Sequence, residues 1–234
     1  MTQFLDPAAV KIDPFGLWFV FMIGVMMPLS VVKSARRPTP ALERQRISQR
    51  LKNVLFLLVL FAIAVFVAWK DGISLFPRIP VTARLVAMCA AVLAAILSMA
   101  ELLLAARTPE ERKRLWVKQI IPRTAAERAV WLLSSAVAGV TEEAIFRGVF
   151  FVLVSALTKS VIAGALISAI VFAIAHYRQG RKSVVMIGLF ALLFQWLIIM
   201  SGSLVPAMAV HALYDMIRGL VAGRRLERLE PATP

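Results

Sequence analysis

The segment from Val140 to Gly148 reads Val-Thr-Glu-Glu-Ala-Ile-Phe-Arg-Gly and places three charges inside an apolar run that extends from Ala129 to Leu157. Each charge at bilayer depth costs at least ~2.5–3.5 kcal/mol on insertion scales, and intramembrane ionisable groups are usually functional. Glu143 and Arg147 are four residues apart, so they share a helical face and can pair. Glu142 lies about 100° further round the helix and is less easily neutralised. One glutamate is therefore expected to be structural and the other chemically available, although a buried ion cluster that only locks helices together is the alternative.

The composition around this segment predicts an all-α polytopic transmembrane bundle. The chain has 234 residues, 60% of them hydrophobic, and a mean hydropathy of +0.81. This is too apolar for an ordinary soluble domain, and repeated uncharged runs have the length of membrane spans. About seven spans are expected, and with no long polar linker they form one transmembrane domain over residues 1–234. The expected spans cover residues 15–32, 54–69, 85–106, 129–157, 161–176, 184–200 and 204–220.

The net charge of +14 could suggest nucleic-acid binding, but the basic residues cluster between the apolar runs. Such clusters are typical of cytoplasmic loops that face anionic lipid. We therefore expect no nucleic acid, an outside N-terminus and an inside C-terminus. The basic segments are residues 33–53, 107–128, 177–182 and 221–234.

Two smaller features accompany this pattern. Residues 107–128 mix basic residues with apolar ones, which fits an interfacial helix and a solvated loop about equally. Cys89 is the only cysteine, so an intrachain disulfide is impossible and core packing is its expected role.

Both histidines of the chain lie in its apolar C-terminal half. His176 ends the fifth expected span, and His211 lies in the seventh, four residues before Asp215 and on the same helical face. A lone histidine in a helix is more often a packed core residue than a catalyst. Here both histidines are accompanied by intramembrane carboxylates, which favours function. Three separate helices thus supply Glu142, His176, and His211 with Asp215.

Other hydrolytic chemistries fit the sequence poorly. No His-Glu-x-x-His zinc helix is present, and no serine stands in a nucleophile-elbow context. The segment Tyr214-Asp215 lacks the second Gly-x-Gly-Asp element of an intramembrane aspartyl protease. What remains is glutamate–histidine activation of water, with a nearby donor for the developing oxyanion.

Three motifs in this order resemble the CAAX protease and bacteriocin-processing family, which includes the type II CAAX prenyl endopeptidases. They are Glu142-Glu143-x-x-x-Arg147, Phe172-x-x-x-His176 and His211-x-x-x-Asp215, and the resemblance covers roughly residues 129–220. It implies a membrane-embedded endopeptidase in which Glu142 and His176 activate water. Glu143 and Arg147 would brace the helix, and His211 and Asp215 would stabilise the oxyanion.

The last motif position departs from the asparagine that is common in the family. An ionised Asp215 cannot donate a hydrogen bond, so it would be protonated, would orient His211, or would join a metal site. The side chains of Glu142, His176, His211 and Asp215 would suit zinc. We favour the metal-free glutamate mechanism, which needs no cofactor, and keep a divalent metal such as zinc as the alternative.

These observations predict a bacterial intramembrane endopeptidase that cleaves a membrane-associated protein or peptide from a cavity open to the cytoplasm. Residues 1–128 would hold three N-terminal spans and basic loops, 129–220 a catalytic four-helix core, and 221–234 a basic cytoplasmic tail. The expected location is the bacterial cytoplasmic membrane. The alternatives are a non-catalytic membrane protein acting in secretion, bacteriocin immunity or partner binding, and a proton- or metal-coupled transporter.

The expected topology contains one conflict. His176 lies near the cytoplasmic end of its span, whereas His211 lies only seven residues from the outer end of its own, or about 10 Å deep. Either the span ends are wrong by several residues, or the last two spans are shifted at the break formed by residues 201–203.

Overall fold

The computed structural model of the chain describes residues 10–36, 46–108, 111 and 121–229. Within these residues the structure is helical and contains no strand, so the all-α prediction is confirmed. The helices form seven continuous rods in this part of the chain. In chain order the rods are α1 (Pro14–Phe21), η3 (Met22–Met26) and α2 (Met27–Ala35); α3 (Ile47–Lys70); α4 (Ala83–Ala105); α6 (Ala125–Glu143), η5 (Ala144–Phe150) and α7 (Phe151–Thr158); α8 (Val161–Ala175); α9 (Arg181–Ser201); and α10 (Val205–Leu229). The short 3₁₀ turn η6 (Tyr177–Gln179) joins α8 to α9.

Four helices among the described residues are long and apolar enough to cross a membrane: Pro14–Ala35, α3, α4 and α9. The helix α8 is apolar but has only 15 residues. The remaining rods, α6 to α7 and α10, carry the charged residues that the sequence places at membrane depth. The number of seven spans therefore stays a prediction.

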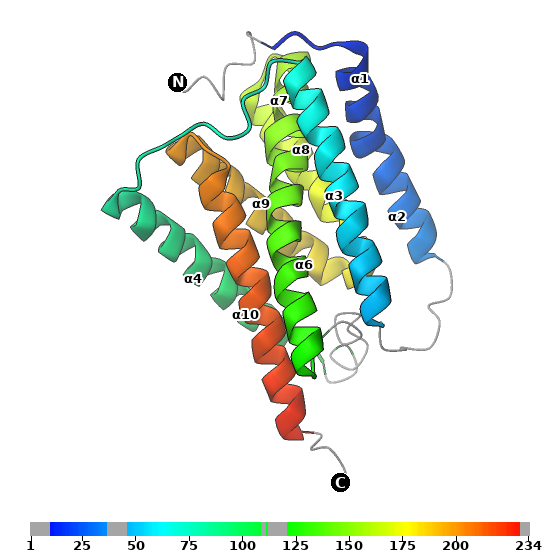
Figure 1. Ribbon diagram of the computed structural model, residues 1–234, viewed down its shortest axis with the longest axis vertical. Helices are drawn as coiled ribbons and strands as arrows, with labels where there is room; N and C mark the ends of the chain where they lie inside the picture. The colour runs from blue at the N-terminus through cyan, green and yellow to red at the C-terminus, as the bar shows by residue number, and fades with distance from the viewer. Residues whose placement is uncertain (1–9, 37–45, 109–110, 112–120, 230–234) are drawn as a thin grey trace.

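Successive rods run in alternating directions, as the basic loops predicted (Figure 1). The helix ends next to the basic segments lie toward the lower end of that view, together with the last turns of α10. At this end Arg107 Nη2 donates to Ser183 Oγ at 2.7 Å, and Lys182 Nζ lies 2.9 Å from Glu111 Oε2. These contacts tie the end of α4 to the start of α9. The expected interfacial helix falls mainly on residues 112–120, outside the described residues.

Helix boundaries coincide with local capping groups. Thr124 Oγ1 accepts from the backbone N–H of Glu127 at 3.2 Å, and Glu127 Oε2 accepts from the N–H of Thr124 at 3.1 Å, which forms a capping box at the start of α6. Ser160 Oγ accepts from the N–H of Ala163 at 3.2 Å and begins α8. Gly202, with φ +73°, ends α9 in the left-handed conformation that glycine adopts without strain.

The helices α6 and α10 approach each other closely at Gly139. A Cβ atom at this position would lie 2.7 Å from the backbone nitrogen of Ala212, so only glycine permits the approach. Eight residues before Gly139 on the same helix, Trp131 Nε1 donates to the carbonyl oxygen of Asp215 at 2.9 Å. This packing sets the last turn of α6 against the turn of α10 that carries His211.

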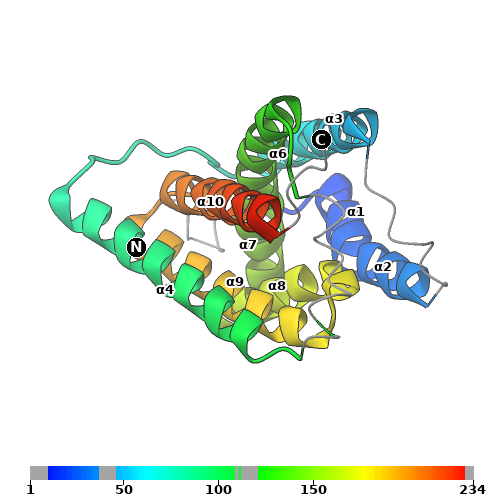
Figure 2. The same ribbon diagram turned by 90° about the horizontal axis from the view of Figure 1, so that it is seen from below.

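The hairpin of α9 and α10 is displaced along the bundle axis relative to the hairpin of α7 and α8. Figure 1 shows the turn between α9 and α10 well below the upper ends of α3 and α7. In addition, α8 is only 15 residues long and ends at His176. The span ends agree with the prediction to within a few residues, apart from the starts of α3 and α6 and the long end of α10. The displacement of α9 and α10 along the bundle axis therefore places His211 at the same depth in the bundle as His176. Seen from below, α4 lies at the edge of the bundle opposite α1 and α2 (Figure 2).

Candidate active site

The backbone changes from α-helix to π-helix directly after the two glutamates. Glu142 and Glu143 end α6, and the π-helical turn η5 begins at Ala144. The carbonyl oxygen of Phe146 within this turn also accepts from Ser168 Oγ of α8 at 2.7 Å. Single π turns inside α-helices occur frequently at functional sites. The straight helix assumed from the sequence is thus locally widened here.

Glu143 and Arg147 form the predicted pair. Arg147 Nη1 donates to Glu143 Oε1 at 2.9 Å, and both side chains are fully buried. The guanidinium of Arg147 also lies over the ring of Phe172, 3.9 Å from its centroid. Two buried charges are costly unless they are paired, so the pair and the aromatic face together hold η5 against α8.

His211 is attached to the same glutamate. Its Nδ1 lies 2.8 Å from Glu143 Oε1, and its ring stacks on Phe194 of α9 with centroids 5.3 Å apart. An ionised carboxylate can only accept hydrogen bonds, so Nδ1 of His211 carries the proton. The other ring nitrogen, Nε2, points away from Glu143. The contact joins residues 68 positions apart, and no sequence signal links them. Glu143 therefore positions a histidine as well as pairing with Arg147.

His176 is oriented by the backbone of its own helix. Its Nδ1 lies 2.8 Å from the carbonyl oxygen of Phe172, and the ring lies against the Phe172 ring with centroids 4.6 Å apart. A carbonyl oxygen accepts only, so Nδ1 is again the protonated nitrogen. In the neutral imidazole Nε2 then keeps its lone pair.

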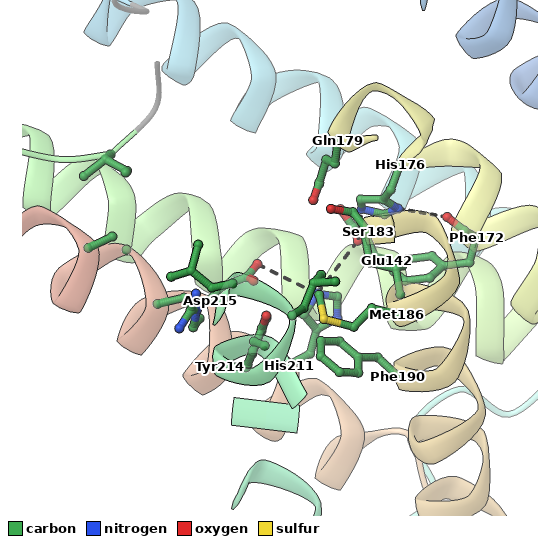
Figure 3. Close-up of a pocket in the computed structure, with 18 of the residues that line it drawn as sticks. Glu142, Phe172, His176, Gln179, Ser183, Met186, Phe190, His211, Tyr214 and Asp215 are labelled. Carbon is green, nitrogen blue, oxygen red and sulfur yellow. Dashed lines mark hydrogen bonds and ion pairs between the residues drawn. The ribbon is translucent and has the colours of Figure 1, made fainter. Parts of the chain in front are cut away.

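The two Nε2 atoms converge on Glu142. Its Oε2 lies 3.9 Å from Nε2 of His176 and 3.9 Å from Nε2 of His211, and Asp215 Oδ2 lies 3.8 Å from the same atom of His211. Figure 3 shows these four side chains directed toward one another from α6, α10 and the end of α8. The separations exceed a direct hydrogen bond, and a water molecule can bridge groups at such distances.

This convergence agrees with the comparison of the chain with known families. Residues 124–217 match the model of a known protein family. The matching family model is described as type II CAAX prenyl endopeptidase Rce1-like, so the resemblance predicted from the three motifs is confirmed. The matched segment extends from the N-cap of α6 into α10 and includes all seven residues named in the three motifs. The match supports the expectation of a CAAX-type membrane protease. Neither the curated proteins nor the solved structures gave a match.

The matched segment and α4 enclose a cavity of about 410 Å³. Glu142, His176, His211 and Asp215 all line it, whereas Glu143 and Arg147 lie behind it in the protein interior. Sequence reasoning did not single out several other polar lining residues, which carry no motif of their own. They are Arg107, Gln179, Ser183, Tyr214 and Arg218. Arg218 pairs with Glu101 of α4.

The four side chains that converge at the cavity include donor types found in metal sites. Two imidazole Nε2 atoms and two carboxylates are of the types that zinc accepts. Among the residues that the structure describes, however, no group of three or more His, Cys, Asp and Glu side chains has the geometry to hold a metal ion.

Proposed function

We propose that the chain is an intramembrane endopeptidase in which Glu142 and His176 activate a water molecule. The observation that carries this proposal is the position of Glu142 Oε2, 3.9 Å from the Nε2 atoms of both histidines inside a cavity. Glu142 is also the only one of the two adjacent glutamates that is partly exposed, at 21% of its side chain, and Glu143 is fully buried. A general base must reach the proton that it removes.

The proposed reaction begins with a water molecule between Glu142 and His176. Glu142 removes one proton while the water oxygen bonds to the carbonyl carbon of the peptide. His176 accepts a hydrogen bond from the same water through the Nε2 lone pair, because Nδ1 is bonded to the carbonyl of Phe172. Glu142 then returns the proton to the amide nitrogen as the carbon–nitrogen bond breaks. Atoms and protons balance, and one water molecule is consumed per bond cleaved.

His211 and Asp215 would stabilise the oxyanion that forms in this step. Nδ1 of His211 already donates to Glu143, so Nε2 can donate to the oxyanion only when the ring is an imidazolium. Glu143, Glu142 and Asp215 all lie within 4 Å of this ring, and they support the positive charge. Donors that are fixed in place before the reaction are the most effective electrostatic catalysts.

The enzyme would lie in a membrane and would receive its substrate from the cytoplasmic side. The cavity includes residues at helix ends near the basic segments, such as Gln179 and Ser183, which supports access from the cytoplasmic side. The substrate would be a membrane-associated protein or peptide, and the basic loops would contact anionic lipid. Residues 129–220 would form the catalytic core of a single transmembrane domain in a bacterial cytoplasmic membrane, with residues 221–234 as a cytoplasmic tail.

The test is peptide cleavage by the purified full chain in lipid nanodiscs, with and without a chelator. We expect cleavage that persists with the chelator and disappears in Glu142→Gln. Loss of activity with the chelator, restored by zinc, would replace the metal-free mechanism by the metal-dependent one. Absence of cleavage in a proteome-derived peptide library would favour the non-catalytic alternative.

A further inference from the structure

Ser168 lies on the face of α8 that also carries Phe172 and His176. The three residues are spaced by four positions, so their side chains project toward the same neighbouring helix. The Ser168 side chain is buried, with 1% of the residue exposed, and it does not line the cavity around Glu142. Contact with an occupant of that cavity is therefore not its role.

The hydroxyl of Ser168 bonds to a neighbouring helix and not to its own. A hydroxyl within a helix often donates to the carbonyl four residues back, as Ser134 Oγ does to Val130 in α6. Ser168 Oγ instead donates at 2.7 Å to the carbonyl oxygen of Phe146, which belongs to the π-helical turn η5. This hydrogen bond joins α8 to η5.

The carbonyl of Phe146 accepts this bond and keeps its own place in the helix. The backbone N–H of Phe151, five residues further on, donates to the same oxygen, as expected in a π-helix. A carbonyl oxygen has two lone pairs and can accept from both donors. Without the Ser168 hydroxyl the carbonyl would still have its backbone donor, so no buried group would be left unpaired and the chain should still fold.

The aromatic contacts on this face of α8 fix its position less strictly. The rings of Phe146 and Phe172 meet edge to face with centroids 4.9 Å apart, and the guanidinium of Arg147 lies over the Phe172 ring. Aromatic pairs are favourable over centroid distances of about 4.5–7 Å, and cation–π contacts anywhere within about 6 Å. A hydrogen bond is shorter and more directional. The bond from Ser168 therefore limits how far η5 can slide along α8.

The distance between Glu142 and His176 depends on this placement. Glu142 lies two residues before η5, and His176 directly follows α8, so sliding of η5 along α8 changes the separation of their side chains. That separation is 3.9 Å between Glu142 Oε2 and His176 Nε2, with no direct hydrogen bond to hold it. His211, by contrast, is bonded to Glu143 on the same helix as Glu142 and would move with it.

We propose that Ser168 is a positioning residue, which sets the distance between Glu142 and His176 through its hydrogen bond to Phe146. The effect on catalysis rests on the proposed function, whereas the effect on geometry does not. A misplacement of about 1 Å can lower a catalysed rate about 100-fold. Ser168→Ala should therefore lower kcat about 10- to 100-fold. The KM should stay nearly unchanged, because Ser168 does not line the cavity.

The experiment observes the site without turnover. The chain has two histidines, so nitrogen-15 labelling of histidine gives ring signals for His176 and His211 alone. The full chain is measured by solid-state NMR in lipid, and His176→Ala assigns the two sets of signals. Ser168→Ala should shift the His176 signals and leave those of His211 in place. Ser168→Thr keeps the hydroxyl, so its His176 signals and its kcat should lie closer to the wild-type values.

Ser155→Ala is the matched control. Ser155 is also 1% exposed and packs against α8 at Gly164, but its Oγ has no hydrogen-bond partner among the described residues. The same substitution at this position removes a buried hydroxyl and no hydrogen bond. It should leave both sets of histidine signals and kcat unchanged.

The outcomes separate positioning from a general effect on packing. Unchanged His176 signals in Ser168→Ala overturn the proposal, and so do equal shifts of both histidines, which would show a general loosening of the bundle. In an active protein, an equal fall of kcat in Ser155→Ala, or a KM that rises as kcat falls, also overturns it. A His176 shift specific to Ser168→Ala supports the positioning role even if the wild-type chain cleaves no peptide, in which case only the proposed function fails.

Discussion

Nδ1 of His211 and Nη1 of Arg147 bond to the same atom, Glu143 Oε1, at 2.8 Å and 2.9 Å. One buried carboxylate oxygen thus connects the helix that carries Glu142 with the helix that carries His211 and Asp215. The other carboxylate oxygen of Glu143, Oε2, has no hydrogen-bond partner among the described residues. The glutamate that looks structural in the sequence is therefore also a positioning residue for the site.

The two adjacent glutamates should respond differently to the same substitution. Glu143→Gln removes the charge that pairs with buried Arg147, and breaking a buried pair costs about 3–5 kcal/mol in soluble proteins. Glu142→Gln removes only a partly exposed carboxylate with no direct hydrogen bond, so stability should hold while cleavage is lost. Thermal unfolding in detergent and peptide cleavage measure the two effects. If both variants were equally stable and equally active, this division would be wrong.

Alanine substitutions of the two histidines should lower the stability of the protein by different amounts. His211→Ala removes one of the two hydrogen bonds to Glu143 Oε1 and a ring stacked on Phe194, while the bond from Arg147 remains, so a loss of about 1.5–3 kcal/mol is expected. His176→Ala removes a hydrogen bond to a backbone carbonyl at a partly exposed position, so about 0.5–1.5 kcal/mol is expected. Both variants should lose cleavage. A stable and active His176→Ala protein would contradict the water-activating role.

The role of Asp215 can be determined by comparing the variants Asp215→Asn and Asp215→Ala. If it acts as a protonated donor to the oxyanion, Asp215→Asn should keep most activity, because the amide also donates. If it supports the imidazolium of His211, Asp215→Asn should shift the acid limb of the pH–rate profile. If it is a metal ligand, activity and bound metal should fall together. Full activity with an unchanged profile in Asp215→Ala would remove this residue from the site.

Asp71, at the end of α3, should make stability depend on pH. Its side chain is buried and accepts from the backbone N–H of Asp13 at 3.0 Å. Burial raises the pKa of the Asp71 carboxyl; the hydrogen bond from the Asp13 backbone opposes this rise, and the Asp13 carboxylate adds to it. The folded state then binds the proton more tightly than the unfolded state, so this stabilisation is complete below the unfolded pKa of about 3.9 and is lost as pH rises through the folded pKa.

Asp71→Asn should accordingly raise the melting temperature at neutral pH and flatten its pH dependence. At a pH well below the unfolded pKa of about 3.9 the two proteins should converge, because Asp71 is then protonated in both states, which provides the internal control. A variant that melts lower than wild type at neutral pH would show that the ionised carboxylate is stabilising.

The topology can be tested by labelling single cysteines in a Cys89→Ser background. Arg36 is exposed at the end of α2, whereas Lys159 follows α7 and Val81 precedes α4. With an outside N-terminus, a cysteine at 36 should react from the cytoplasmic side, and cysteines at 159 and 81 from the outer side. Labelling of positions 36 and 159 from the same side would contradict the predicted alternation.

The sequence alone was sufficient for the helical class, the approximate helix ends and the pairing of Glu143 with Arg147. These depend on local properties, namely the lengths of apolar runs, capping residues and four-residue spacing on one helix. The grouping of Glu142 with two histidines also followed from the sequence, through ordered motifs that the Rce1-like match confirms as a family resemblance.

Only the tertiary structure decided how those motifs meet. The bond between Glu143 and His211 joins residues 68 positions apart, and it requires the close approach of α6 and α10 at Gly139. The level of His176 and His211 depends on the short α8 and on the displaced hairpin of α9 and α10. Arg107 enters the cavity wall because the end of α4 packs against the start of α9. Such relationships depend on how helices are placed against one another, and that placement is set by packing over the whole bundle, which no single stretch of sequence contains.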